Sequence, residues 1–579
     1  MDVTKSNFNQ LLPAIKDAIK NCTFASIDCE MTGLNVIRDI NAFDTPGEYY
    51  VKVKKNCLDF LVIQYGLSLF RYDEENNIFK QSTYNFYIFR KPINRNIPDQ
   101  RFLCQSSSID FLTSQGFDFN KLFKDGLPYL TSQEYDKCKS NLEEKKKNHI
   151  FTIQNQNRDV IPVPDNLKAF IEDVTKKLEN FAESNETEIS LPKCSPFARK
   201  LIYQVAGEKF ENKLTLESRQ VEKDRILFAV RQRTKEKEQE IIEKKHEEDL
   251  QQLEDYIGFS KVLEVLRESK KLIIGHNLCL DLLHTIDKFM TPLPEDYEDF
   301  KVCVQKIFPH VIDTKYMASS EPFKDLISST VLKSLLDTVT QEPFEIIPTE
   351  IETGAEGYKI GDDKEHEAGY DAFITGLSFI SMWRYLGTKA NKSPKDTFKD
   401  LKLLNKMLNR IFTMSLVDNQ YINLQGKDLN PSRDHVFYLT FPKDWKYNNI
   451  VELFSPFGPV FVSWLDDTSA YVSLQKKDQA ALVLKTLSQN DSYSIIPFNM
   501  RKEMLESSPS RRRKFDVANH GSTKKMRMTS LERYNVEVPG DAVESTTEPQ
   551  DKNAGMWESV PKKNKRRTTK TFKESGAWE

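Results

Sequence analysis

Two acidic residues lie inside a segment that otherwise has the character of a buried strand. The stretch "FASIDCEM", residues 24–31, is rich in apolar residues but places Asp28 and Glu30 one residue apart. Because residues i and i+2 of a strand point to the same side, both acids would face one spot, with Cα atoms about 7 Å apart. Two like charges in one place indicate a bound cation, since burying them unpaired is costly. An edge strand that exposes both acids to water is the alternative.

The length and cysteine usage limit the class of protein. A chain of 579 residues is too long for one domain, and two to four domains are expected. The eight cysteines are scattered and form no C-x-x-C pairs. This pattern favours a reducing compartment and argues against a zinc module.

The two ends of the chain differ in character. The start, residues 1–22, has no signal-peptide pattern and predicts an amphipathic helix, and no apolar run reaches membrane-spanning length. A protein without a membrane segment is therefore expected. Residues 501–579 contain 18 Lys and Arg against 12 Asp and Glu. Such basic clusters are typical of nuclear import signals or nucleic-acid contacts, and equally of a disordered tail kept soluble by charge.

Charged segments divide the chain. Residues 133–160 are polar and charged, and residues 233–254 are almost entirely charged, which predicts a solvated helix or linker. The expected parts are therefore 1–160, a small module at 165–235, a return to apolar patterns at 236–425, a compact unit at 434–503, and a basic, disordered tail at 505–579.

Two later segments each carry one more acid at the start of a predicted helix. In "KKLIIGHNLCLDLLHTIDKF", an apolar strand leads through a polar turn into a helix that begins near Asp281. In "EHEAGYDAFITGLSFISMWRYL", Asp371 lies early in a helix, and His366 precedes it. One acid in a first helical turn is explained by the helix dipole alone. Together with Asp28 and Glu30, the two acids favour a catalytic site.

These segments carry a resemblance to a known family. "IDCEMTGL", "GHNLCLDLLHT" and "HEAGYDAFITG" resemble the three exonuclease motifs of the histidine-containing DEDD superfamily. Residues 105–123, 311–327 and 433–445 are similar to the poly(A)-specific ribonuclease family, and the similarity spans about residues 1–500. The resemblance implies an α/β fold: a ribonuclease-H-like exonuclease core with a mixed central sheet, a small inserted nucleic-acid-binding-type domain, and an α+β domain like the RNA recognition motif.

The resemblance also implies roles for individual residues. Asp28, Glu30, Asp281 and Asp371 would bind two Mg²⁺ ions, for which Mn²⁺ could substitute, because four carboxylates match the charge of two divalent ions. Glu30 would also help to orient the attacking water, and His366 would be the general base.

Substrate contacts follow from the same resemblance. Met31 and Leu34 would pack against the terminal nucleotide, and ordinary core packing is the alternative for both. Asn277 and Lys315 would contact the RNA, with Lys315 neutralising a phosphate.

The two smaller modules depart from their families at single positions. The module at 165–235 resembles the Arg-x3-His domain, but Arg199 is followed four residues later by Tyr203 rather than His. In the unit at 434–503, Tyr471 is retained but Ser469 stands where an aromatic residue is expected, which weakens the case for ordinary base stacking. The resemblance assigns Trp464 to the mRNA cap through a cation–π contact, with a half-buried strand residue as the alternative.

The expected protein is a Mg²⁺-dependent 3′-to-5′ exoribonuclease that shortens the poly(A) tails of mRNA and releases 5′-AMP. The resemblance implies a homodimer that acts on single-stranded RNA, with the cap as a further ligand, in the nucleus and cytoplasm. Three alternatives stay open: an enzyme that trims small non-coding RNA precursors, a catalytically silent RNA-binding scaffold, and a DNA exonuclease.

Overall fold

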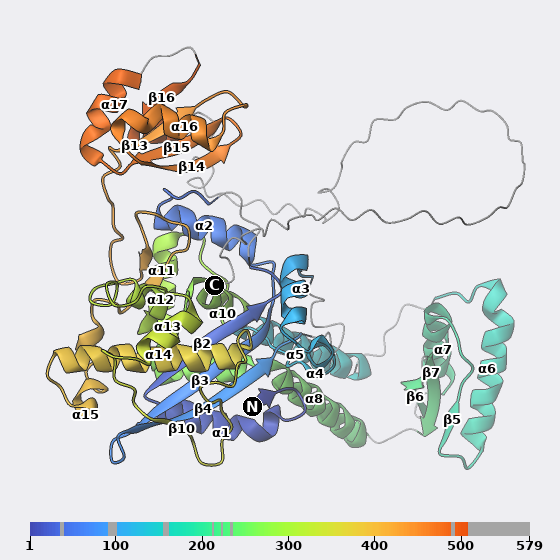
Figure 1. Cartoon of the computed structure of the whole chain (residues 1–579). Coiled ribbons are helices and arrows are strands. Elements are labelled where there is room, and N and C mark those ends of the chain that lie inside the picture. Colours follow the sequence, from blue (N-terminus) through green and yellow to red (C-terminus); the bar gives the residue numbers. More distant parts are fainter. Residues whose placement is uncertain are drawn as a thin grey trace, which may run out of the picture. The chain divides into compact units, whose positions relative to one another are not determined.

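A computed structural model describes residues 1–34, 40–90, 101–154, 161–210, 213–221, 224–231, 235–487 and 492–507. The chain divides into two compact units at Pro431/Ser432 (Figure 1). Almost all of the expected basic tail lies outside the described residues. Within the part that the structure describes, every helix falls short of the length and apolar character that a membrane crossing would need.

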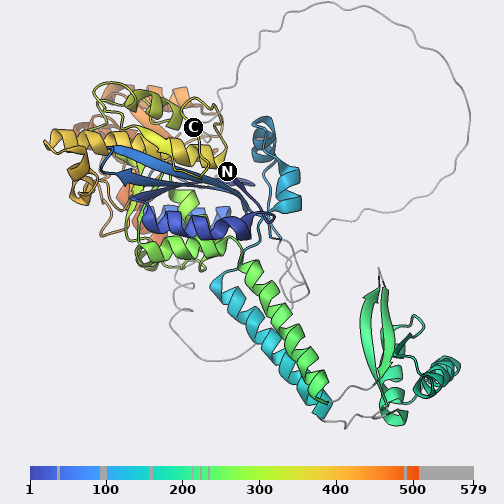
Figure 2. The same ribbon diagram turned by 90° about the horizontal axis from the view of Figure 1, so that it is seen from below.

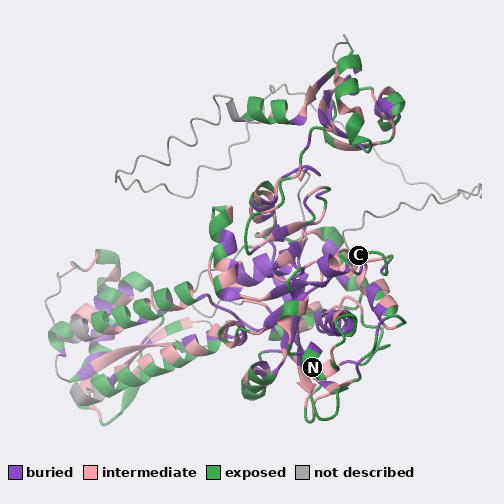
Figure 3. Cartoon of the chain, turned by 90° about the vertical axis from the view of Figure 1, so that its left-hand side faces the viewer, coloured by how far each residue is buried: buried purple, intermediate pink, exposed green. Residues whose placement is uncertain are grey.

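A mixed sheet forms the centre of the first unit, and most of its strand residues are buried (Figure 3). The order is β1-β4-β3-β2-β8-β9, and β10 also pairs with β4. Strand β2 pairs antiparallel with β3 and parallel with β8, which confirms the expected mixed sheet. The strands of this sheet are β1 (Asp2–Val3), β2 (Phe24–Met31), β3 (Val62–Asp73), β4 (Ile78–Tyr87), β8 (Leu272–Gly275), β9 (Val311–Asp313) and β10 (Thr349–Ile351).

Helices cover both faces of this sheet, with α1 on one side and α14 on the other (Figure 2). The face toward α1 buries Ala25, Ile27 and Cys29 of β2, and the face toward α14 buries Phe24. Alternation along β2 therefore places Asp28 and Glu30 on the α14 side. The helices of this unit outside the inserted module are α1 (Phe8–Asn21), α2 (Pro46–Cys57), α3 (Ser106–Ser114), α4 (Phe119–Asp125), α5 (Ser132–Gln154), α8 (Lys235–Ile257), α9 (Ser260–Ser269), α10 (Cys279–Phe289), α11 (Tyr297–Ile307), α12 (Thr314–Ala318), α13 (Leu332–Val339), α14 (Ala368–Lys389), α15 (Pro394–Thr397) and the 3₁₀ turn η1 (Leu401–Leu404).

The charged segments form two long helices, which agrees with the solvated helix predicted as one alternative for residues 233–254. Helices α5 and α8 lie side by side (Figure 2), and a narrow apolar seam that includes Leu142 and Leu253 joins them. Most of their other positions are polar, which explains why the sequence shows no wide apolar face.

Residues 161–231, which lie between α5 and α8 in the sequence, form a separate hydrophobic core. Leu178, Leu201 and Ala229 are among its fully buried members. Its elements are α6 (Asp165–Glu183), β5 (Glu188–Ser190), α7 (Pro196–Lys209), β6 (Leu214–Val221) and β7 (Asp224–Arg231), and its strand order is β5-β7-β6.

The second unit contains a four-stranded antiparallel sheet with the order β14-β15-β13-β16. Its elements follow the predicted strand–helix–strand–strand–helix–strand order, and a final helix is added. They are β13 (Val436–Thr440), α16 (Tyr447–Phe454), η2 (Ser455–Phe457), β14 (Val460–Asp466), β15 (Ser469–Leu474), η3 (Lys477–Gln479), α17 (Ala480–Leu487), β16 (Ser494–Pro497) and α18 (Phe498–Ser507). A two-stranded hairpin, β11 (Arg410–Phe412) and β12 (Tyr421–Asn423), lies before this unit in the chain.

Candidate active site

The structure brings together the acids that the sequence places in three separate segments. Asp28 and Glu30 lie on β2, Asp281 in the first turn of α10, and Asp371 in the first turn of α14. Glu30 and Asp281 are 8% and 7% exposed, while Asp28 and Asp371 are half-buried.

The four carboxyl groups are close enough to change one another's protonation. Burial raises the pKa of all four, and that of Asp28 reaches about 7. The charge of Asp28 further raises the pKa values of the other three acids. The Cys29 thiol hydrogen-bonds the carboxyl of Asp281. Buried carboxyl groups with raised pKa values tend to hold protons. A bound cation stabilises their charged form and so takes the place of these protons.

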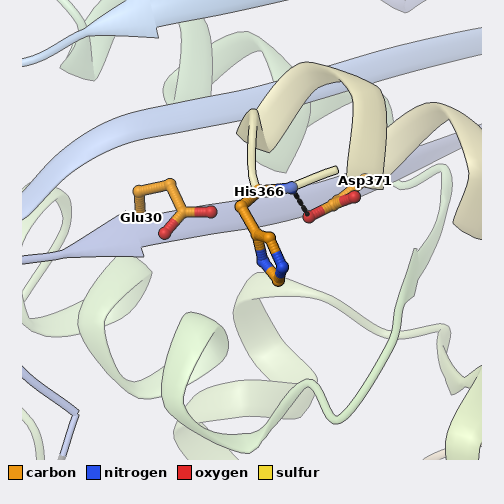
Figure 4. A group of neighbouring side chains, drawn as sticks. All are labelled: Glu30, His366 and Asp371. Carbon is orange, nitrogen blue, oxygen red and sulfur yellow. Dashed lines mark hydrogen bonds between the residues drawn. The ribbon is translucent and has the colours of Figure 1, made fainter. Parts of the chain in front are cut away.

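His366 lies at the edge of this cluster. One ligand atom each of Glu30, His366 and Asp371 falls within 4.8 Å of the others (Figure 4). The backbone N–H of His366 donates to Oδ2 of Asp371 at 3.0 Å, and the residue has a φ of 67°. Burial lowers the pKa of its imidazole, which keeps the ring neutral and able to accept a proton.

The donor set fits hard divalent cations. Carboxylate oxygens are the ligands that Mg²⁺ and Mn²⁺ favour. The one neutral imidazole beside them is better suited to act as a general base than to bind the metal as a fifth ligand. The arrangement can therefore hold cations beside a group that takes up a proton.

Phe111 of α3 contacts the candidate base and was missed in the sequence. Its ring and that of His366 meet edge to face, with centroids 4.7 Å apart. The segment around Phe111 carried the family resemblance, but nothing in its local pattern indicated this contact.

Asp313 is a second residue that the sequence analysis missed. Its carboxylate is fully buried at the end of β9 and accepts four backbone N–H bonds at 2.9–3.0 Å, from Asn277, Leu278, Lys315 and Phe412. It thereby ties the turn before α10 to α12 and to β11, and so helps to hold Asp281 in place. The strand-then-helix pattern around "VIDTKYM" was its only signal.

The predicted RNA contacts lie in different surroundings. Met31 is 3% exposed and belongs to the core on the α1 side, and half-buried Leu34 packs against the same core. Half-buried Asn277 has a φ of 56°, and the Lys315 ammonium lies 5.7 Å from the Phe412 ring centroid. Nucleotide contacts by these four residues stay predictions.

The two smaller modules present their key residues differently. Arg199 donates from Nη2 to the carbonyl of Arg225 at 3.0 Å, which ties α7 to β7, and Tyr203 packs against the module's core. In the second unit, Ser469 is buried, and Phe498 of α18 lies against Tyr471 with ring centroids 5.0 Å apart. The sheet face used for base stacking in an ordinary RNA recognition motif is therefore partly covered by α18.

Trp464 is the exposed aromatic residue of interest in the second unit. It is 42% exposed on the edge strand β14, and its ring meets that of Phe441 edge to face with centroids 5.2 Å apart. One face of an indole at such a position is able to receive a flat cationic ring.

Comparison with known proteins finds relatives for both parts of the chain. Residues 3–379 match the CAF1 family ribonucleases, and residues 426–504 match an RNA binding domain family. The chain is 40% identical to the poly(A)-specific ribonuclease PARN of Bos taurus over 506 residues, covering 86% of this chain and 79% of the relative. It is 37% identical to the PARN of Xenopus laevis over 554 residues, covering 94% and 87%. The solved structure of S. pombe Pop2p in its Mg²⁺- and Mn²⁺-bound form aligns with 72% of this chain and 98% of its own, with 16% identity and a TM-score of 0.34.

The similarity to the two PARN relatives extends over 86% and 94% of this chain. The chain therefore belongs to the CAF1 family of ribonucleases and, within it, to the poly(A)-specific ribonucleases, which are exoribonucleases that act in deadenylation.

Proposed function

We propose that this exoribonuclease is a divalent-metal-dependent enzyme that removes adenosines from the 3′ end of RNA and releases 5′-AMP. The observation that carries the proposal is the meeting of Asp28, Glu30, Asp281 and Asp371 beside His366, in surroundings that raise the pKa of every one of the four acids. The four acids would bind two Mg²⁺ ions.

The residues of the chain then have separate tasks. Two bound ions would supply Lewis-acid activation of water and stabilisation of the leaving oxygen. The neutral imidazole of His366 would accept the proton of the attacking water, and Glu30 would orient that water. Asn277 and Lys315 would hold the phosphate backbone of the RNA, and Met31 and Leu34 would contact the terminal nucleotide.

We extend the proposal to the cap and to assembly. Trp464 would stack on the methylated guanine of the mRNA cap, and the exposure of its ring on β14 supports this role.

The family resemblance supports a homodimer and a distribution between nucleus and cytoplasm. It also supports the division of the chain into parts at residues 1–160, 165–235, 236–425, 434–503 and 505–579.

A time course on a 5′-labelled RNA with twenty 3′-terminal adenosines tests the central proposal. The expected result is a ladder that shortens from the 3′ end with Mg²⁺ and disappears with EDTA, and that is slower on an RNA with a mixed-sequence tail. Equal trimming of both tails would indicate an enzyme that trims small non-coding RNAs. Tight binding without trimming would indicate a scaffold.

A further inference from the structure

The start of helix α14 is held by side chains from the central sheet. Gln64 of β3 accepts the N–H of Ala368 through Oε1 at 2.9 Å, and Asn85 of β4 accepts the N–H of Gly369 through Oδ1 at 2.7 Å. The first N–H groups of a helix need partners from outside the helix. Here the sheet supplies them, and the side chain of Glu367 at the N-cap position turns toward Asn85 instead.

One of these two amides lies directly opposite the catalytic strand, and the other lies one strand further away. In the β2–β3 ladder, Gln64 pairs with Glu30, and Gly66 pairs with Asp28. In the β3–β4 ladder, Gly66 pairs with Asn85. Gln64 is therefore the direct neighbour of Glu30, while Asn85 is separated from Asp28 by Gly66.

Gly66 lets the helix come this close. A Cβ atom at this position would lie 1.9 Å from the backbone oxygen of Ala368 and 2.6 Å from the nitrogen of Gly369. Both contacts are with backbone atoms, which cannot turn away, so any larger residue would push the start of α14 off the sheet.

The amide of Asn85 also organises the segment before the helix. Its Nδ2 donates to Oε1 of Glu367 at 2.5 Å and to the hydroxyl of Tyr358 at 3.2 Å, and that hydroxyl donates to Glu367 at 2.9 Å. Glu367 lies between His366 and the helix. Gln64 and Asn85 are 1% and 0% exposed, so solvent does not replace these bonds.

We infer that Gln64, Gly66 and Asn85 form a docking joint that positions Asp371 and His366 against Asp28 and Glu30. They are positioning residues: they act on the metal-binding geometry through the start of α14. The inference rests on the proposed function, because it gives Asp371 the role of a metal ligand.

Mn²⁺ binding to the RNA-free protein, followed by calorimetric titration, tests the joint without catalysis. Gln64→Met keeps the volume of the side chain and removes the acceptor, and Asn85→Ala removes the whole amide. Each is expected to weaken Mn²⁺ binding about tenfold, or about 1.4 kcal/mol, as for other residues that orient metal ligands. With saturating metal, the KM for RNA should stay within about twofold of wild type while kcat falls, because the joint does not touch RNA.

Ser68→Ala is the matched control. Ser68 lies on β3, is fully buried, and shares its hydrogen bond with Thr83 of β4 at 2.7 Å rather than with α14. This variant should bind Mn²⁺ as wild type does.

The outcomes separate the two proposals. If wild type binds no Mn²⁺ and trims no RNA, the proposed function is wrong. Suppose instead that wild type binds Mn²⁺, and that either Gln64→Met binds it equally well or Ser68→Ala weakens binding as much as Gln64→Met does. The positioning role of the docking joint is then refuted, and the proposed function is unaffected. Should Asn85→Ala fail to fold, the isosteric Gln64→Met decides the question alone.

Discussion

The two halves of the acidic cluster are placed in different ways. Asp28 and Glu30 share one strand, and the alternation of that strand alone brings them to one face. Asp281 and Asp371 start two helices, and partners distant in the sequence hold those starts: Asp313 is 35 residues from Leu278, and Gln64 is 304 residues from Ala368. The strand half therefore depends on local geometry, and the helix half depends on buried polar residues from distant parts of the chain.

Removing a strand acid should have the largest effect. Asp28→Ala is expected to lower trimming about 10³-fold or more, because a ligand of the ions that stabilise the transition state is lost. RNA binding in EDTA should be retained. The buried Ser26 of the same strand gives the control Ser26→Ala, which should stay active. If the Asp28→Ala enzyme were active, the assignment of the strand acids as metal ligands would be wrong.

Removing a support of the helix half should have the next largest effect. Asp313→Ala removes the acceptor of four backbone N–H groups that are buried or partly buried, and we expect a loss of about 3 kcal/mol in the free energy of unfolding. Displacement of the α10 turn should lower kcat about 10²-fold. Chemical denaturation and trimming kinetics measure both losses.

The control for this prediction is an aspartate that caps a different helix, one that carries no proposed catalytic residue. Asp296 accepts two N–H groups at the start of α11. Asp296→Ala should lower the free energy of unfolding by about 1 kcal/mol and leave kcat unchanged. Equal kcat values for the two variants would show that Asp313 is a structural residue only.

The pH dependence of stability in EDTA shows whether the two halves form one cluster. Burial raises the pKa of Asp28 from an ordinary 3.8 to about 7, so between these values the folded protein holds a proton that the unfolded chain releases. Stability from this group is therefore full below about pH 4 and is lost as the pH rises through 7. The melting temperature should fall between about pH 4 and pH 7.

Two comparisons sharpen this measurement. Asp28→Asn should flatten the pH dependence, since it also removes the charge that raises the pKa values of Glu30, Asp281 and Asp371. Mg²⁺ should raise the melting temperature more at pH 8 than at pH 5, because it competes with protons. An unchanged slope in Asp28→Asn would mean that the halves do not interact.

The smallest effect on trimming is expected from the second unit. Trp464→Ala should leave the trimming rate of uncapped RNA within about twofold, because surface substitutions away from a site change little. Binding of a methylated cap analogue, measured by fluorescence, should weaken about tenfold through loss of the cation–π contact. Leu465→Ala, a change at a neighbouring position that is 41% exposed, should keep cap binding. If Trp464→Ala bound the cap analogue as tightly as wild type, the proposed stacking of Trp464 on the cap would be wrong.

The sequence alone determined the elements that carry the chemistry. Period-two alternation identified β2, and helical spacing identified the starts of α10 and α14, because these patterns are local consequences of burial on one face. The order of elements in the second unit was predictable for the same reason. The resemblance of three short segments then indicated that the acids belong together.

Only the tertiary structure decided how the acids are held. Gln64, Asn85 and Asp313 are ordinary polar residues in strand segments, and their partners lie up to 304 residues away. Local patterns record which face of an element is buried, but they do not record which distant N–H group a buried amide or carboxylate will accept. That choice is made when the sheet and helices pack, since each buried polar group must then find its partner.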